Sequence, residues 1–270
     1  MMNKKLKFVF NKNTFYIILF INIILLLITL SNSYTDGYNI RQAQTAIIAR
    51  NIFYDNFNIF PTRISFFAPQ KGNLIFEFPF IHFLTALTYK FFPISEINGR
   101  FINLLFYVFN GILFYKIQKL IFKNYIAVIT SILFISSPQL LYLGHAYMPE
   151  TSMMFFYLLA YYFFIKNKIK YNNKNEIFMF VSLAIAPLLK PPAAIIGLPI
   201  FLDYLKEKKI KSVIRKYIPF ILCALPLLLW MYYGTLINSS DSSTGANWTW
   251  NQILFKGSLF YDWFDYNFYL

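Results

Sequence analysis

Acidic side chains are scarce in this sequence, and several stand beside long apolar runs, where a carboxylate could take part in chemistry. The chain has 11 Asp and Glu against 25 Lys and Arg. Asp36 follows the first apolar run, Glu77 lies between two phenylalanines in FEFP, and Glu150 ends the stretch HAYMPE. Lys190 in LLKPP and Arg100 in NGRF stand at the ends of other apolar runs. Charged groups at membrane boundaries are costly unless paired or solvated, so these residues are functional candidates.

Each candidate also has a purely structural interpretation. A carboxylate near a helix start, as expected for Glu77 and Glu150, is stabilised by the positive end of the helix dipole. Lys190 could extend its amino group to the lipid headgroups, and Asp36 in TDGY is a good turn residue. His145 is one of only two histidines, and histidines of this kind more often pack than bind ligands. Because there is no cysteine cluster either, we expect no metal site.

The composition is that of a polytopic, all-α membrane protein. The chain is 58% hydrophobic and 13% charged, with a mean hydropathy of +0.49, whereas soluble domains are about 45–50% apolar and about 25% charged. The net charge of +14 comes from lysines in short clusters between apolar runs. That pattern indicates loops at an anionic membrane face and not a nucleic-acid-binding surface. The single cysteine, Cys223, excludes an internal disulfide.

Hydropathy predicts a transmembrane helical bundle of about seven spans. The first apolar run has no clear cleavage site and is therefore expected to remain as a span. The expected spans are residues 14–31, 102–115, 125–143, 151–165, 177–189, 193–205 and 217–236. With the N-terminus inside, 17 of the 25 Lys and Arg fall on inner segments. The positive-inside rule therefore predicts a multi-pass protein of the plasma membrane with a cytoplasmic N-terminus.

This topology places residues 32–100 outside, as a first extracytoplasmic loop with membrane-lying helices. The segment 39–57, NIRQAQTAIIARNIFYDNF, has the rhythm of an amphipathic helix. Its apolar side chains are expected to face lipid or neighbouring helices, while Arg41, Gln42, Gln44 and Arg50 line a cavity for phosphate and sugar. The segment 78–92 is too short and too polar for a span and is expected to lie in the membrane interface.

No soluble nucleotide-binding or hydrolase motif is present. The sequence lacks GxGxxG, GxxxxGK[ST] and GxSxG. The residues fit group transfer from a lipid-linked donor instead. A carboxylate near the membrane surface could deprotonate an acceptor hydroxyl, and Lys and Arg side chains could hold the lipid phosphate as the leaving group.

Five stretches together resemble a known family. In order they are DGYNIRQAQTAIIARN, FEFPF, NGRFINLLF, SPQLLYLGHAYMPETSM and LLKPP. The sequence resembles the polytopic GT-C glycosyltransferases, in particular relatives of the dolichyl-phosphate-mannose–protein mannosyltransferases and of the aminoarabinose transferase that acts on lipid A. The resemblance implies membrane-lying helices after the first span. It also implies a longer protein, of which residues 1–270 are the N-terminal part of the GT-C domain.

The resemblance implies roles for the candidate residues. The catalytic base of the family is an acid of the first outer loop, which makes Asp36 the first candidate and Glu77 the second. Many relatives hold an acid within the helix, where this chain has Gln44. Two further alternatives therefore stay open: Glu150 is the base, or the chain is inactive. The remaining implied substrate-binding residues are Arg41, Gln42, Gln44, Arg100, His145, Glu150 and Lys190.

The function expected from the sequence is therefore a membrane glycosyltransferase. It would move a sugar from a polyprenyl-phosphate-linked donor to a glycan, lipid or protein acceptor on the extracytoplasmic face, with membrane lipids as further partners and without cofactor, metal or nucleic acid. The alternatives are a non-catalytic or degenerate membrane fragment and a flippase or transporter of lipid-linked sugars. A transporter is expected to carry charges in mid-span and inverted repeats, and neither is seen in the sequence.

Overall fold

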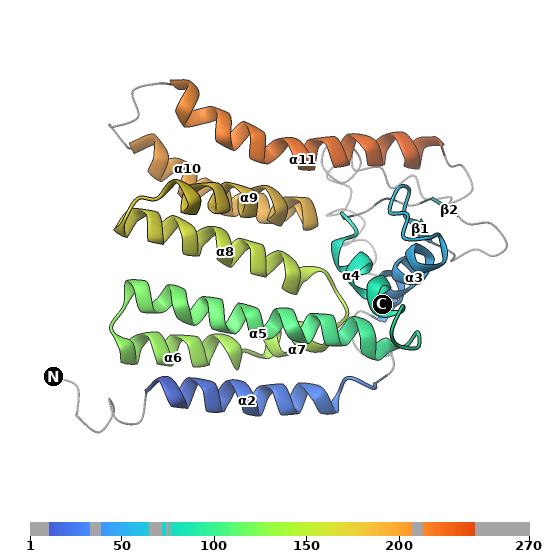
Figure 1. Cartoon of the computed structure of the whole chain (residues 1–270), viewed down its shortest axis with the longest axis horizontal. Coiled ribbons are helices and arrows are strands. Elements are labelled where there is room, and N and C mark those ends of the chain that lie inside the picture. The colour runs from blue at the N-terminus through green and yellow to red at the C-terminus, as the bar shows by residue number, and fades with distance from the viewer. Residues whose placement is uncertain are drawn as a thin grey trace, which may run out of the picture.

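The body of the protein is a stack of roughly parallel helices, with two short helices and a small hairpin across one end (Figure 1). The computed structural model describes residues 11–32, 39–64, 72–73, 75, 77–206 and 213–240. The helices are α2 (Lys12–Ile28), α3 (Asn39–Tyr54), α4 (Phe80–Thr88), α5 (Glu96–Ile121), α6 (Asn124–Ile135), α7 (Pro138–His145), α8 (Glu150–Ile169), α9 (Asn173–Leu189), the 3₁₀ helix η1 (Pro191–Ile196), α10 (Gly197–Lys206) and α11 (Val213–Ser240). The strands β1 (Arg63–Ile64) and β2 (Gly72–Asn73) pair antiparallel. The predicted all-α class is confirmed.

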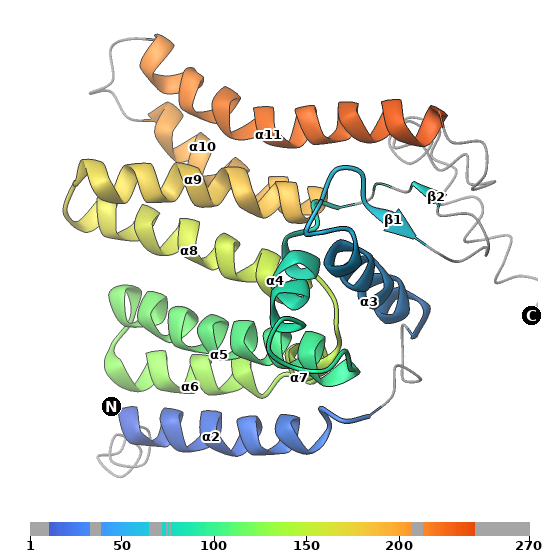
Figure 2. The ribbon, with the colours of Figure 1, turned by 45° about the vertical axis from the view of Figure 1, so that its right-hand side comes forward.

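Both views show α3 and α4 beside the end of the bundle where α5 and α8 begin (Figures 1 and 2). We call this the site end. The predicted interfacial segment 78–92 contains α4, which is shorter, because Pro79 occupies its N-cap position and Thr88 ends it. The predicted helix 39–57 is α3, which stops at Tyr54; Asn56 and Phe57 then take left-handed φ angles of 54° and 63°. Ile48 and Ile52 of α3 pack against Ala86 of α4.

Every predicted span contains a helix, but the predicted number of spans is not confirmed. Within the described ranges, two helical stretches are long and apolar enough to cross a membrane, Glu96–Ile121 and Tyr217–Ile237. A third is reached if α6 and α7 count as one span. Helix α2 is strongly apolar but has 17 residues, fewer than the roughly 20 that a perpendicular crossing needs.

The predicted span 125–143 is broken into α6 and α7, which meet at an angle of 57°. The cause is Pro138, which has no N–H for the helix ladder and disfavours helical geometry at Ser137. Ser137 then caps the new helix, because its hydroxyl accepts a hydrogen bond from the N–H of Leu140 at 3.4 Å.

Buried asparagines of α5 hold the turn between α7 and α8. Asn103 is fully buried, and its side-chain amide donates to the carbonyl oxygen of Ala146 and to that of Met148 at 2.8 Å. About two helical turns further along α5, Asn110 donates to the carbonyl oxygen of Thr151, in the first turn of α8, at 2.9 Å. In apolar surroundings, hydrogen bonds to the backbone carbonyls of a turn fix its position.

The same turn packs against the backbone of α5 at Gly99. A Cβ atom built on Gly99 would lie 2.5 Å from ring atoms of Tyr147, which is fully buried. Only glycine leaves room for this ring, so the start of α5 and the α7–α8 turn are fitted to each other. By contrast, a Cβ atom on Gly197 would meet its nearest neighbour, Leu183, at an ordinary 3.6 Å.

We therefore expect Gly99→Ala to lower the free energy of unfolding by about 1–3 kcal/mol, the usual cost of overpacking. The matched change Gly197→Ala should be neutral or stabilising by up to about 1 kcal/mol, because alanine favours helices over glycine. Denaturant unfolding of both variants in detergent measures this difference. Equal stability of the two variants would show that the close packing of Tyr147 on Gly99 is not required.

Candidate functional site

Two ion pairs lie at the site end. The guanidinium of Arg41, on α3, pairs through Nη2 with Oε1 of Glu77, just before α4. The amino group of Lys190, directly after α9, pairs with Oε1 of Glu150, the first residue of α8. Each pair joins segments that are far apart in the sequence, so four of the residues proposed from the sequence are brought into contact two by two.

Two backbone contacts bring the segments that carry these pairs together. The N–H of Phe78, next to Glu77, donates to the carbonyl oxygen of Leu188 near the end of α9 at 3.4 Å. The side-chain oxygen of Gln42 on α3 accepts a hydrogen bond from the N–H of Tyr147 in the α7–α8 turn at 3.0 Å. The start of α3, residues 77–79, the α7–α8 turn and the end of α9 therefore form one region.

Local sequence explains the positions of Lys190, directly after α9, and of Glu150, at the start of α8. Helix α9 ends at Leu189, because Lys190 precedes Pro191 and takes an extended conformation with φ −154° and ψ 113°. At the start of α8, Pro149 occupies the N-cap position, and the Glu150 carboxylate lies in the first turn of the helix. A carboxylate there is favoured by the helix dipole, in addition to its ion pair with Lys190.

Within each ion pair the cation is the more exposed partner. The side chain of Arg41 is 25% exposed against 11% for Glu77, and that of Lys190 is 30% exposed against 15% for Glu150. The second oxygen of Glu150, Oε2, is buried and has no hydrogen-bond partner within the described part of the chain. Each cation is thus held by a carboxylate that is more deeply buried than the cation itself.

Three further candidates were proposed from the sequence, and two of them, Gln44 and His145, are not members of the ion pairs. The third, Asp36, falls outside the described residues. Gln44 is half-buried one helical turn from Arg41. His145 ends α7 and makes an edge-to-face contact with Tyr142 at 5.4 Å between ring centroids.

Gln42 and Arg50, expected to line a cavity with Arg41, lie in different surroundings. Gln42 is fully buried, and its side-chain oxygen binds the α7–α8 turn. Arg50 lies nine residues beyond Arg41, which is half a revolution away on an α-helix. It lines a separate groove of about 280 Å³ with Tyr89 and Glu96. Arg100 is likewise fully buried on α5, so it supports the region from within the fold.

Two structural residues of the region were missed in the sequence. Asn103 and Gly99 stand in the stretch NGRFINLLF, and they position the α7–α8 turn from the side of α5. A signal was present for Asn103, because an amide within an apolar run demands an explanation. For Gly99 no local signal exists, since its requirement comes from the ring of Tyr147, which lies far away in the sequence.

A cluster of aromatic side chains lies next to Glu77 in the sequence and connects its segment to α11. Phe78 and Phe60 both meet Trp230 of α11 edge to face, with ring centroids 5.1 Å and 5.9 Å apart. Tyr233 packs on Phe60 and Trp230 at 5.8 Å from each. Helix α11 is therefore fixed against the segment that carries Glu77.

His82 on α4 is a buried neutral imidazole near Arg41. Its side chain is almost fully buried, and burial, with a smaller contribution from the positive charge of Arg41, lowers the pKa of His82 to about 3. No group of three or more His, Cys, Asp or Glu that could hold a metal ion is found among the described residues.

A bundle of apolar helices, two of them long and apolar enough to cross a membrane, with carboxylate–cation pairs at one end fits an integral membrane protein. The sequence model of the dolichyl-phosphate-mannose-protein mannosyltransferase family matches residues 77–233. This match covers more than half of the chain, and the chain belongs to this family. The resemblance proposed from the sequence motifs is thereby confirmed. No curated protein and no solved structure shows a significant match to the chain.

The Lys190–Glu150 pair predicts a non-additive pattern of stabilities. Lys190→Met leaves the Glu150 carboxylate largely buried without its cation, so we expect a loss of about 2 kcal/mol in the free energy of unfolding. In Lys190→Met/Glu150→Gln no charge remains unpaired, and most of that loss should be recovered. Unfolding of the two single variants and the double variant in detergent gives the coupling. Additive losses would contradict the pairing.

Acidification should destabilise the protein through His82. Because its pKa is lower in the folded protein than the ordinary 6.5, the neutral ring contributes stability above pH 6.5, and this contribution is lost as the pH falls towards 3. Between pH 7 and pH 5 the expected loss is about 2 kcal/mol. His82→Gln, which cannot titrate, should remove this part of the pH dependence. An unchanged pH profile in the variant would contradict the assignment to His82.

Proposed function

We propose that the chain transfers a sugar from a polyprenyl-phosphate-linked donor to a hydroxyl-bearing acceptor on the extracytoplasmic face of the plasma membrane. The acceptor is a protein, glycan or lipid. In this proposal residues 1–270 are the N-terminal part of a GT-C domain with a cytoplasmic N-terminus, and residues 32–100 form its first extracytoplasmic loop. The family membership supports a membrane glycosyltransferase, and the geometry of the ion pairs supports the use of a lipid phosphate.

The exposure of Arg41 and Lys190 is the observation that carries the proposal. Both cations are more exposed than the carboxylates that hold them. Arginine and lysine are the usual ligands of phosphate oxygens, and a charge-assisted bond to phosphate is stronger than a neutral one. In the proposal the donor phosphate binds Arg41 and Lys190, each of which is oriented by its carboxylate partner, Glu77 or Glu150.

The proposed reaction uses one base and two cations. Asp36 accepts the proton of the acceptor hydroxyl as its oxygen forms a bond to the anomeric carbon of the sugar. The bond between that carbon and the phosphate oxygen breaks, and the electron pair leaves with the polyprenyl phosphate. Arg41 and Lys190 stabilise the negative charge that develops on this leaving group. Glu77, the second carboxylate of the proposed catalytic site, orients Arg41 through their ion pair.

The other candidates have supporting roles in the proposal. Gln42 and Arg100 are fully buried, which favours positioning of α3 and of the start of α5 over direct contact with substrate. Gln44, half-buried one turn from Arg41, suits a hydrogen bond to the sugar. His145 ends α7 before the turn that carries Glu150 and suits a contact with the donor from that side.

The proposal predicts that Asp36→Asn lowers the rate of transfer by about 10²-fold or more, the usual contribution of a general base. Glu77→Gln should raise KM for the donor, because Arg41 loses its orienting carboxylate. Purified full-length chain is assayed with polyprenyl-phosphate mannose and hydroxyl-bearing peptide, glycan and lipid acceptors. Glu96→Gln is the matched control, because it makes the same chemical change at an exposed acid of α5.

Two outcomes would count against these assignments in different ways. Unchanged transfer in both Asp36→Asn and Glu77→Gln, with active wild type, would reject the site but keep the function. Absence of transfer by the wild type to every acceptor class would reject the function and leave a non-catalytic member of the family.

A further inference from the structure

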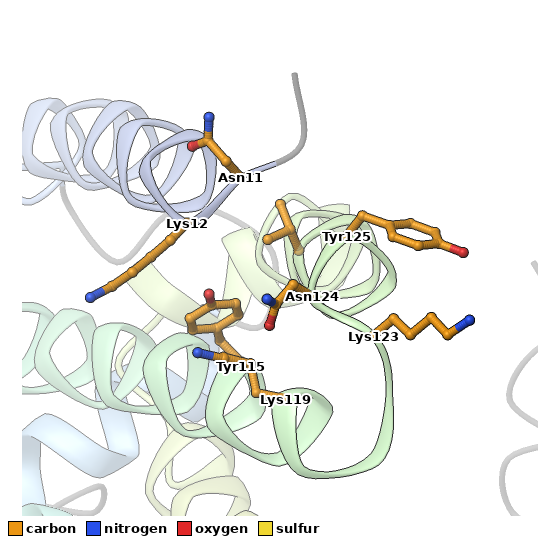
Figure 3. Close-up of a pocket in the computed structure, with 8 residues that line it drawn as sticks. Asn11, Lys12, Tyr115, Lys119, Lys123, Asn124 and Tyr125 are labelled. Carbon is orange, nitrogen blue, oxygen red and sulfur yellow. The ribbon is translucent and has the colours of Figure 1, made fainter. Parts of the chain in front are cut away.

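A basic pocket lies at the opposite end of the bundle from the ion pairs. It has a volume of about 430 Å³ and is formed where α2 begins, α5 ends and α6 begins (Figure 3). Among the described residues, its polar lining comes from Asn11, Lys12, Lys119, Lys123, Asn124, Tyr115 and Tyr125, none of which is acidic. From this geometry we infer a binding site for the phosphate headgroup of an anionic membrane phospholipid.

Lysines from the start of α2, the end of α5 and the connection to α6 line the pocket together with Tyr115. Figure 3 shows the Lys119 amino group beside the Tyr115 ring, with Lys12 and Lys123 extending to opposite sides. The amino group of Lys119 lies 5.9 Å from the centre of the Tyr115 ring, and that of Lys12 lies 5.5 Å from the Tyr16 ring. These aromatic contacts hold the stems of the two lysines without neutralising their charge.

Helix α6 adds backbone donors on the same side. Its first residue, Asn124, lines the pocket, and its N-cap residue, Lys123, makes no side-chain capping bond in the described structure. The first N–H groups of a helix without a cap favour an anion. Two ammonium groups, a phenol and these N–H groups together match a phosphate diester that carries one negative charge.

Neighbouring apolar side chains favour a lipid over a soluble phosphate as the source of this group. Tyr16 on α2 and Ile121 and Phe122 at the end of α5 are between 40% and 51% exposed. Helix α5 is one of the stretches able to cross a membrane, so its end lies near the headgroups. A phospholipid can therefore place its phosphate in the pocket and its acyl chains along the exposed apolar faces.

The test compares two charge-removing double variants of the full chain in nanodiscs. Lys12→Gln/Lys119→Gln should bind fluorescent phosphatidylglycerol about thirtyfold more weakly than wild type, which corresponds to about fivefold per lysine. Lys170→Gln/Lys174→Gln removes the same charge from exposed positions near the α8–α9 connection and should bind almost as wild type does. Lys12→Arg/Lys119→Arg, which keeps the charge, should retain binding and shows that the double change does not unfold the protein.

Three results would overturn the inference. One is an equal loss of binding in both charge-removing variants, which would indicate general attraction to the membrane surface. Another is equal binding of phosphatidylglycerol and phosphatidylcholine by wild type. The third is a rise in the melting temperature with inorganic phosphate as large as that with phosphatidylglycerol, which would assign the pocket to a soluble anion.

Discussion

The backbone of the turn between α7 and α8 is the constraint on which the arrangement of the site end depends. The chain leaves one helix and enters the next in apolar surroundings, where a free carbonyl or N–H group is expensive. Asn103 satisfies two of its carbonyls from the side of α5. Gln42 satisfies the Tyr147 N–H from the side of α3. The hydrogen bonds that satisfy the backbone of this turn therefore hold the amphipathic helix α3 against the bundle. They also fix the position of Glu150, which directly follows the turn.

The two ion pairs gain their geometry from this docking. Arg41 directly precedes Gln42, so the contact of Gln42 with the turn brings Arg41 within reach of Glu77. Glu150 is the first residue of α8 after the same turn and lies within reach of Lys190. Burying a charge pair costs solvation energy, which the mutual attraction recovers only with good geometry. Here the cations keep part of their hydration and the carboxylates give up most of theirs. Such a pair is better suited to presenting a fixed cation than to stabilising the fold.

The sequence was informative where the signal is local. Every predicted span contains a helix, and charged residues beside apolar runs identified Glu77, Glu150 and Lys190 as candidates, although not their ion pairs. The break at Pro138 was also a local signal, although the segment was predicted as one span. The number of spans was not confirmed, because hydropathy locates apolar helices but does not measure whether each is long enough to cross.

Long-range contacts explain most of what the sequence did not reveal. Gln42 and Tyr147 are 105 positions apart, and nothing in the pattern of α3 distinguishes a glutamine that binds a distant turn from one that faces a cavity. The close approach of Gly99 to Tyr147 is of the same kind. Arg50 was assigned to the wrong groove for a simpler reason, since counting the helical angle from Arg41 would have placed it on the opposite side.

The composition of α3 bears on which residue acts as the base in the proposed mechanism. The helix contains no Asp or Glu. The carboxylate that orients Arg41 therefore has to come from another segment, and Glu77 supplies it. Oε1 of Glu77 is occupied by the guanidinium of Arg41, and the side chain of Glu77 is 11% exposed. Glu77 is thus better suited to orienting the cation that meets the phosphate, and proton transfer falls to an acid outside the pair, for which Asp36, three positions before α3, is the proposed residue.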